Sequence, residues 1–335
     1  MRQTEILIIG QGIAGSLTAF MLYQQGIPFL VMDSGYNNTA SRVAAGMFTP
    51  ISGKRKTINK ELLQQIPFAI TVYRQIEKLL NENFLHVQNV YYVPNSVEEQ
   101  DEFIKKQNTI DYTGHIHSAA AVLPNIKQTH GAFEITNSGW VDCTLFTNSF
   151  KDWVKQKNAL IEEAFNYDEI KITKDIIQYK DIECKEVIFC EGYRAINNPF
   201  FKEETIIPCK GDMLTIEYKG CDTAFIIKKD AAYLIPLGNH IFKAGSTYKW
   251  GNSDETPDES DKKEIVDKLN AMLENDYTIV QHQSAIRPTT KNREVIAKQH
   301  SVHSNMFMLN GFGTKGIIQG PYWAKQIVSI AIKQL

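Results

Sequence analysis

The stretch EILIIGQGIAG, residues 5–15, decides how the rest of the chain is organised. It begins with an unbroken aliphatic run at residues 6–9, which is typical of a parallel strand buried on both faces. Three glycines follow at the G-x-G-x-x-G spacing, Gly10, Gly12 and Gly15. The first makes a tight turn, the second lets the backbone approach a pyrophosphate, and the third lets helix and strand pack closely. Residues 16–25 are expected to form the helix whose N-terminus faces the phosphates.

A second strand and an acidic residue complete the motif. Residues 29–32 (FLVM) read as the next parallel strand, and Asp33 follows 18 residues after Gly15. A carboxylate there accepts hydrogen bonds from ribose hydroxyls and repels a 2′-phosphate, which disfavours NADP. The alternative is a glycine-rich turn that binds nothing, but strand, glycines, helix, strand and acid in register favour a dinucleotide. The neighbouring candidates for contact are Ile13, Ala14 and Ser34.

Length, charge and cysteine content exclude several classes of protein. The 335 residues are 43% apolar, and 36 basic against 38 acidic residues leave a net charge of −2. This balance offers no overall attraction for nucleic acid or an anionic membrane. No apolar run approaches the ~20 residues of a membrane span, and the first strand begins too early for a secretory signal, so we expect a cytoplasmic protein. The five cysteines include no C-x-x-C pair and imply neither a disulfide framework nor a zinc site.

The loop after Asp33 carries the next signal. Residues 40–50, ASRVAAGMFTP, are rich in small side chains, which let a backbone lie against a flat ligand. The pattern S-x-x-A-A-G-x-x-x-P resembles the second signature of the D-amino-acid oxidase family of flavoproteins, which includes glycine and sarcosine oxidases. The resemblance implies that this loop covers FAD, and it narrows the cofactor from NAD or FAD to FAD. The implied contacts are Ser41, Arg42, Ala44, Ala45, Gly46 and Met47.

Beyond this loop the pattern changes from β–α–β to a mixed architecture. Apolar residues at three- and four-residue steps predict a long amphipathic helix over residues 60–81. Asp142 is a candidate N-cap for a helix over residues 145–157. Further strands are expected at 84–93, 119–123, 132–136, 160–163, 176–179 and 186–190, a charged helix at 97–106, and short strands from 208 onward before an acidic loop at 254–261 and a helix.

Two polar clusters in this part have alternative interpretations. His86, His115, His117 and His130 include an H-x-H pair, but without a nearby Cys/Asp/Glu set we favour solvated loop histidines over a metal site. The basic cluster at residues 53–56 could touch an acidic substrate, although a short charged run is usually only solvated.

A third signature lies near the C-terminus. Residues 285–293, AIRPTTKNR, resemble the family's R-P-x-T-x-D stretch, with Asn292 where aspartate is usual. A strand at 306–309 leads into NGFGTKG, where a glycine turn and a helix N-terminus suit the C2 carbonyl edge of a flavin. The implied cofactor contacts are Gly192, in the turn after the 186–190 strand, and Asn310, Gly311, Phe312, Gly313, Thr314, Lys315 and Gly316.

The resemblance also assigns three catalytic candidates. Arg287 matches the arginine that pairs with the substrate carboxylate in amino-acid oxidases; the alternative is a structural salt bridge. Tyr233 matches a tyrosine that donates to the same carboxylate, with core packing equally plausible. Lys243 resembles the lysine that sits over the flavin and assists oxygen in sarcosine-type oxidases, with a solvent-facing strand lysine as the alternative.

Together these signatures predict an α/β (α+β) fold, in which a Rossmann-type FAD-binding domain is interleaved with a mixed-sheet substrate domain. The FAD-binding domain is expected at 1–60, 140–207 and 285–335, and the substrate-binding domain at 61–139 and 208–284. The resemblance implies oxidation of the C–N bond of a small amino acid or secondary amine by hydride transfer to flavin N5. No cysteine near Arg287 in the sequence suggests a covalent tether, so FAD is expected to bind non-covalently.

Two other functions remain open at this point. Lys315 in the glycine turn resembles the branch that oxidises a carboxymethylaminomethyl group on tRNA wobble uridine, although the chain's balanced charge makes nucleic acid an unlikely partner. The departures at Asn292, Ala297 and Lys315 also allow a flavin-binding module without turnover. We expect a small-molecule substrate with a carboxylate and no membrane partner. The sequence leaves the oligomeric state undetermined.

Overall fold

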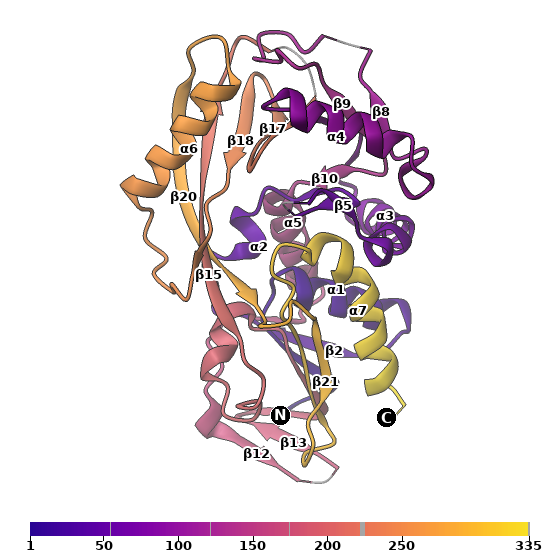
Figure 1. Cartoon of the computed structure of the whole chain (residues 1–335). Helices are drawn as coiled ribbons and strands as arrows, with labels where there is room; N and C mark the ends of the chain where they lie inside the picture. The colour runs from indigo at the N-terminus through magenta and orange to yellow at the C-terminus, as the bar shows by residue number, and fades with distance from the viewer. Residues whose placement is uncertain (54, 121, 174, 222–224, 334–335) are drawn as a thin grey trace.

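The computed structural model describes residues 1–53, 55–120, 122–173, 175–221 and 225–333. Two large sheets lie at opposite ends of an elongated molecule, and the paired strands β15 (Ile207–Glu217) and β20 (Thr278–Thr289) extend between them (Figure 1). The predicted mixed α/β architecture is confirmed. The strands after residue 208 are not all short as expected, because β15 and β20 pair along almost their whole lengths.

The first sheet is built around the N-terminal strand. β1 (Arg2–Ile9) pairs in parallel with β2 (Phe29–Met32) on one side and β14 (Ile182–Phe189) on the other. The sheet continues in parallel through β11 (Leu160–Ile161) beyond β2 and β22 (Met306–Asn310) beyond β14. Its antiparallel additions are β12 (Ile170–Ile172), β13 (Ile177–Tyr179) and β21 (Ile296–Gln299). The carboxyl ends of the parallel strands therefore meet at one edge, where ligands bind in open α/β sheets.

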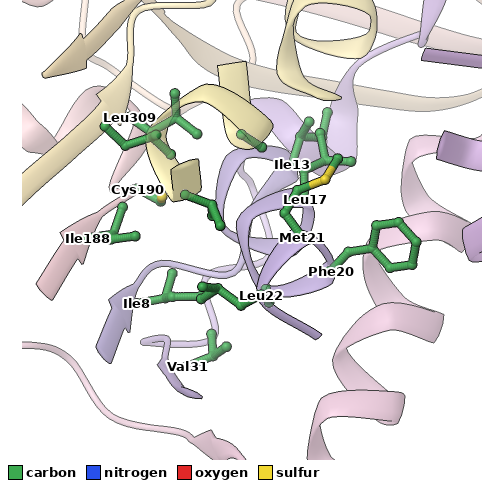
Figure 2. Packing of buried hydrophobic residues seen from close by; sticks show 14 of the residues in the cluster. Ile8, Ile13, Leu17, Phe20, Met21, Leu22, Val31, Ile188, Cys190 and Leu309 are labelled. Carbon is green, nitrogen blue, oxygen red and sulfur yellow. The ribbon is translucent and has the colours of Figure 1, made fainter. Parts of the chain in front are cut away.

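Helices pack against this sheet. α1 (Ile13–Gln24) packs against α7 (Gly316–Ala331), and a Cβ added at Gly320 would lie only 2.7 Å from Leu17 Cδ1. Figure 2 shows Leu22 of α1 close to Ile8 of β1 and Val31 of β2, whereas Phe20 points away from these strands. The unbroken aliphatic run of β1, residues 6–9, is buried as the sequence predicts.

Two further helices pack with α1 and α7, and the first sheet together with these four helices is called the first body. α3 (Lys60–Leu80) ends at Asn81 in the left-handed conformation and packs against α7, so its core belongs with the first sheet. α5 (Cys143–Gln156) begins after Asp142, whose carboxylate accepts a hydrogen bond from Leu145 N at 2.9 Å. Both helices and the Asp142 cap agree with the sequence predictions. The domain boundary placed at residue 285 falls inside β20.

The second sheet has nine strands among the described residues. Its order runs from β19 (Lys249–Trp250) through β15, β18 (Ile241–Gly245), β17 (Ala232–Gly238) and β16 (Ile226–Lys229). It continues with β7 (Val90–Tyr92), β9 (Phe133–Ile135) and β8 (Ile116–Ser118), while β20 pairs with β15. α6 (Glu259–Met272) packs on β15, β17 and β18. The remaining short elements are α2 (Ala40–Val43), β3 (Met47–Phe48), β4 (Ile51–Ser52), β5 (Thr57–Ile58), β6 (Leu85–Val87), α4 (Val97–Gln107), β10 (Gly139–Val141) and the 3-10 turns η1 (Ile110–Tyr112), η2 (Tyr167–Glu169) and η3 (Gly192–Asn197).

Several sequence predictions need correction. The strand expected over 84–93 is two strands, because β6 pairs with β10 whereas β7, beyond residues 88–89, belongs to the second sheet. The strand expected at 119–123 is absent from the described residues of that range, and residue 121 lies outside the description; the strand is instead β8, a few residues earlier. The acidic loop ends sooner than expected because Asp258 caps α6. None of the described helices combines the length and hydropathy needed to span a membrane.

Candidate FAD and substrate site

A cavity of about 570 Å³ opens where the carboxyl ends of the parallel strands face the second sheet. The glycine turn after β1, the small-residue loop around α2 and the turn before α7 line it from the first body. β15, β16, β17 and β20 line it from the second sheet. The cavity therefore joins the three sequence signatures, which are far apart in the chain.

The glycine turn is too crowded for side chains. Gly10 has φ of +100°, and a Cβ there would lie 2.4 Å from Cys190 O. A Cβ on Gly15 would meet Gly10 O at 1.8 Å, and one on Gly12 would lie 2.7 Å from Ser41 Oγ. The turn thus brings bare backbone and the start of α1 to the cavity, which fits the pyrophosphate of a dinucleotide.

Asp33 is held in a fixed orientation at the end of β2. Its Oδ2 accepts a hydrogen bond from Gln11 N at 2.7 Å, and its Oδ1 accepts one from Gly35 N at 2.8 Å. The carboxylate also lines the cavity. Backbone donors on both oxygens leave further lone pairs to accept from ribose hydroxyls, as the sequence predicts.

The small-residue loop contacts both the first body and the second sheet. Ser41 Oγ accepts a hydrogen bond from Ile13 N at 3.0 Å, which joins the loop to the first turn of α1. Gly46 has φ of +71°, and a Cβ there would lie 1.9 Å from Val141 O. From the second sheet, Lys243 Nζ donates to Ala44 O at 3.2 Å. The alternative of a solvent-facing Lys243 is wrong, because this side chain is buried at 9% exposure.

The turn before α7 links two strand ends. Asn310 Nδ2 donates to Gly192 O at 2.8 Å, so the turns after β22 and β14 lie side by side. Gly313 N donates to Pro288 O at 2.8 Å, which joins the same turn to β20. Lys315 lines the cavity and directly precedes α7. Backbone amides and a helix start therefore face the cavity here as well.

Arg287 enters the cavity from the second sheet. A Cβ on Gly211 would lie 2.1 Å from Arg287 Nη1, so the guanidinium rests on the bare backbone of β15. Nη2 donates to Ser246 Oγ at 2.9 Å and Nη1 to Thr247 O at 3.2 Å, while the Tyr248 ring stacks on the guanidinium with Cζ 4.5 Å from its centroid. Among the described residues, no carboxylate forms an ion pair with Arg287. The salt-bridge alternative therefore has no partner in the described part of the chain.

Tyr233 lies on the cavity face of β17. Its cross-strand partners are Lys228 on β16 and Gly245 on β18, and Gly245 in turn pairs with Met213 on β15. Directly paired residues share a face of a sheet, so these positions form one row facing the cavity. The Tyr233 hydroxyl lies 3.2 Å from Met213 Sδ, and burial raises the pKa of Tyr233 to about 12. The hydroxyl therefore stays protonated as a hydrogen-bond donor at neutral pH.

The sequence of the chain matches a known protein family over almost its whole length. The family model described as FAD dependent oxidoreductase (DAO) matches residues 5–330. The chain belongs to this family. It is therefore an FAD-dependent oxidoreductase of the D-amino-acid oxidase type.

Individual relatives are distant in sequence but similar in length. Glycine oxidase of Bacillus subtilis (strain 168) is 21% identical over 344 residues, covering 96% of this chain and 90% of the relative. The crystal structure of glycine oxidase from Geobacillus kaustophilus superposes with a TM-score of 0.83 at 15% identity, covering 99% of this chain and 95% of that one. Iminodiacetate oxidase from Chelativorans sp. BNC1 gives a TM-score of 0.83 at 16% identity, covering 98% and 95%. These structural similarities establish the fold.

Most of the residues of this oxidoreductase that the sequence predicts to contact the cofactor line the cavity. They are Gly10, Gly12, Ile13, Ala14, Asp33, Ser34, Ser41, Ala44, Ala45, Gly46, Met47, Gly192, Asn310, Phe312, Gly313, Thr314, Lys315 and Gly316. Three residues assigned to the cofactor, Gly15, Arg42 and Gly311, are not among the lining residues, and neither is the catalytic candidate Lys243. Gly15 packs under Gly10, and Arg42 Nη1 donates to Asn37 Oδ1 at 3.1 Å.

The structure also adds lining residues that sequence reasoning missed. Tyr36, Tyr193 and Arg194 form a cluster at the cavity, in which Arg194 stacks on Tyr36 with Cζ 3.7 Å from the ring centroid. Arg194 and Tyr193 both donate to Glu255 of the acidic loop, at 2.7 and 2.5 Å. Lys228 is a further missed residue: it pairs with Tyr233 across the hairpin of β16 and β17 and lines the cavity.

His86 and Lys56 differ from expectation. His86 is not a solvated loop residue: it lies in β6, its ring stacks on Trp140 at 4.2 Å, and burial lowers its pKa. The described residues contain no group of His, Cys, Asp and Glu suited to a metal ion. Lys56 is ion-paired with Glu99 rather than merely solvated, and Lys54 lies outside the described residues.

The structure places one cysteine closer to Arg287 than the sequence suggests. Cys209 pairs across β15 and β20 with Arg287, so a thiol does lie near this arginine in space. It is buried at 1% exposure and does not line the cavity, whereas Cys190 does. Burial raises the pKa of both thiols, which keeps them protonated and poorly nucleophilic.

Proposed function

We propose that this oxidoreductase oxidises the C–N bond of a small amino acid or secondary amine that carries a carboxylate, with FAD bound non-covalently. The observation that carries the proposal is Arg287, whose guanidinium lines the cavity without an acidic partner among the described residues. A planar cation with unused donors suits a bidentate carboxylate. The similarity to glycine and iminodiacetate oxidases supports the same class of substrate.

The first body would hold the cofactor. The glycine turn and the start of α1 would receive the pyrophosphate, Asp33 the ribose, and the small-residue loop and the Asn310–Gly316 turn the flavin. When bound, FAD supplies a two-electron acceptor that takes a hydride from the substrate carbon. The raised pKa of Cys190 at the cavity and of Cys209 beside Arg287 supports the non-covalent state, because a neutral thiol is a poor nucleophile.

The chain's own residues would orient the substrate. Arg287 and the protonated Tyr233 hydroxyl would bind its carboxylate, while Ser246 and Thr247 keep the guanidinium in place. The substrate carbon loses a hydride and its nitrogen loses a proton, which leaves a C=N double bond. Water then adds to that bond and releases a carbonyl compound and an amine. With an amine that arrives deprotonated, no protein base is required.

Two experiments test the proposal. Purified protein should be yellow, and denaturation with acid should release all of its flavin into the supernatant. Under anaerobic conditions, at least one member of a panel of small amino acids and N-methyl amino acids should bleach the flavin. Flavin that stays with the precipitate would contradict non-covalent binding. A panel that leaves the flavin oxidised throughout would contradict the proposed chemistry and favour a module without turnover.

A further inference from the structure

Lys228 is a cation in the cavity that the reaction described above does not use. It lies on β16, lines the cavity and is mostly buried. Among the described residues, its Nζ has no hydrogen-bond or ion-pair partner. Neighbouring cations differ in this respect: Lys56 pairs with Glu99, and Lys229 Nζ donates to Lys127 O at 2.8 Å and Ala271 O at 3.1 Å.

An unpaired charge in such a place is costly. Burial lowers the pKa of Lys228, the charge of Lys56 lowers it further, and Asp230 partly opposes this shift. A protein retains such a group without an internal partner at a cost in stability, which an external anion in the cavity would relieve. The side chain is therefore poised to receive an acidic group.

The strand register places this cation relative to Arg287. Lys228 is paired with Tyr233, and the row continues through Gly245 to Met213 on β15, two residues from Gly211. The guanidinium of Arg287 rests on Gly211. Three strand spacings separate β16 from β15, or roughly 14 Å between backbones, and two long side chains reach into that space. Tyr233 stands between the two cations.

We propose that Lys228 binds a second anionic group of the substrate, so that the preferred substrate is an amine or amino acid carrying two acidic groups. One carboxylate would lie at Arg287 and Tyr233, and the other at Lys228, which fixes both ends of the molecule. This inference rests on the proposed function, because it assumes that Arg287 binds the first carboxylate.

Equilibrium binding of two unreactive acids separates the two anchors. Glutarate carries two carboxylates, butyrate is the same molecule with one carboxylate replaced by hydrogen, and neither has an amine to oxidise. Binding to the FAD-loaded protein is measured by calorimetry and by the change in flavin absorbance. We expect glutarate to bind about tenfold or more tightly than butyrate, because of the additional charge pair in a poorly solvated site.

The variants assign this preference to a residue. Lys228→Met should bring the ratio of the two affinities close to one, and Lys228→Arg should restore much of it. Lys229→Met is the matched control, because the neighbouring lysine points to the opposite face of β16 and should leave the ratio at the parental value. Achiral amines give a second readout: iminodiacetate should reduce the flavin with a lower apparent dissociation constant than sarcosine, and Lys228→Met should abolish this difference.

The outcomes distinguish this proposal from the one on which it rests. If butyrate binding depends on Arg287 but the parental protein binds both acids equally, the role of Lys228 is refuted and the Arg287 site stands. A glutarate preference that survives Lys228→Met refutes it as well. If neither acid binds the parental protein, both the carboxylate site at Arg287 and the second anchor are refuted.

Discussion

Replacing Gly211 by alanine tests whether the position of Arg287 controls the reaction. The added Cβ would lie 2.1 Å from Nη1, 2.3 Å from Nη2 and 2.4 Å from Cζ. Ordinary van der Waals contact needs at least about 3.4 Å, so the guanidinium must move by more than about 1 Å. The obstacle is the flexible end of a side chain rather than backbone, and we expect the protein to fold and bind FAD normally. The guanidinium, however, would leave its bonds to Ser246 and Thr247.

The expected loss of rate follows from the hydrogen bonds between Arg287 and the substrate carboxylate, which the displaced guanidinium would no longer make. One such bond contributes about 2 kcal/mol, which corresponds to roughly a thirtyfold change. The second-order rate constant of anaerobic flavin reduction, measured by stopped flow with the best substrate of the panel, should fall by about this factor. Arg287→Ala should lower it by roughly a hundredfold or more, and Arg287→Lys should recover only part of the loss.

A double mutant makes the test decisive. If Gly211→Ala acts only by displacing Arg287, adding it to Arg287→Ala should change the rate little further. A second thirtyfold loss on that background would refute the reasoning, since Gly211 would then act through something other than the guanidinium. An unchanged rate in the single Gly211→Ala variant would also refute it. Flavin content and thermal stability, measured on each variant, identify any loss of cofactor or fold.

Three other predictions concern the scaffold. Gly12→Ala places a methyl group 2.7 Å from Ser41 Oγ, and titration of the apoprotein should show at least about tenfold weaker FAD binding; parental affinity would contradict a phosphate site there. Burial, with Glu5 nearby, raises the pKa of Glu186 to about 8, so its contribution to stability is present below its ordinary pKa and is lost as pH rises through 8. Glu186→Gln should therefore raise the urea midpoint more at pH 8.5 than at pH 5, and an equal shift at both values would show that Glu186 is not protonated in the fold. Asp142→Ala removes the cap on α5 and should cost about 1 kcal/mol in urea unfolding, whereas Asp142→Asn should cost little.

Local sequence determined the first body because its signals are short-range. The strand over residues 6–9, the glycine spacing and Asp33 obey backbone sterics and helix geometry, which act over a few residues. The Asp142 cap and the long helix over residues 60–81 are local patterns of the same kind, and both agree with the structure. The resemblance to the flavoprotein family, carried by three such patterns, is confirmed by the family match over residues 5–330.

Only the tertiary structure decided the neighbours of each cavity residue. Strand pairing brings Cys209 next to Arg287, although these positions are far apart in the chain. Lys228 and Tyr233 pair within one short hairpin, but the meeting of that hairpin with the cavity depends on distant segments. Burial of Lys243 against Ala44 likewise depends on two segments about two hundred residues apart. Alternation within a strand shows that two side chains share a face, but not which face will meet a partner or how strands are ordered. Those choices are made when the sheets pack and exclude water, and for that reason the unpaired lysine in the cavity could be found only in the folded protein.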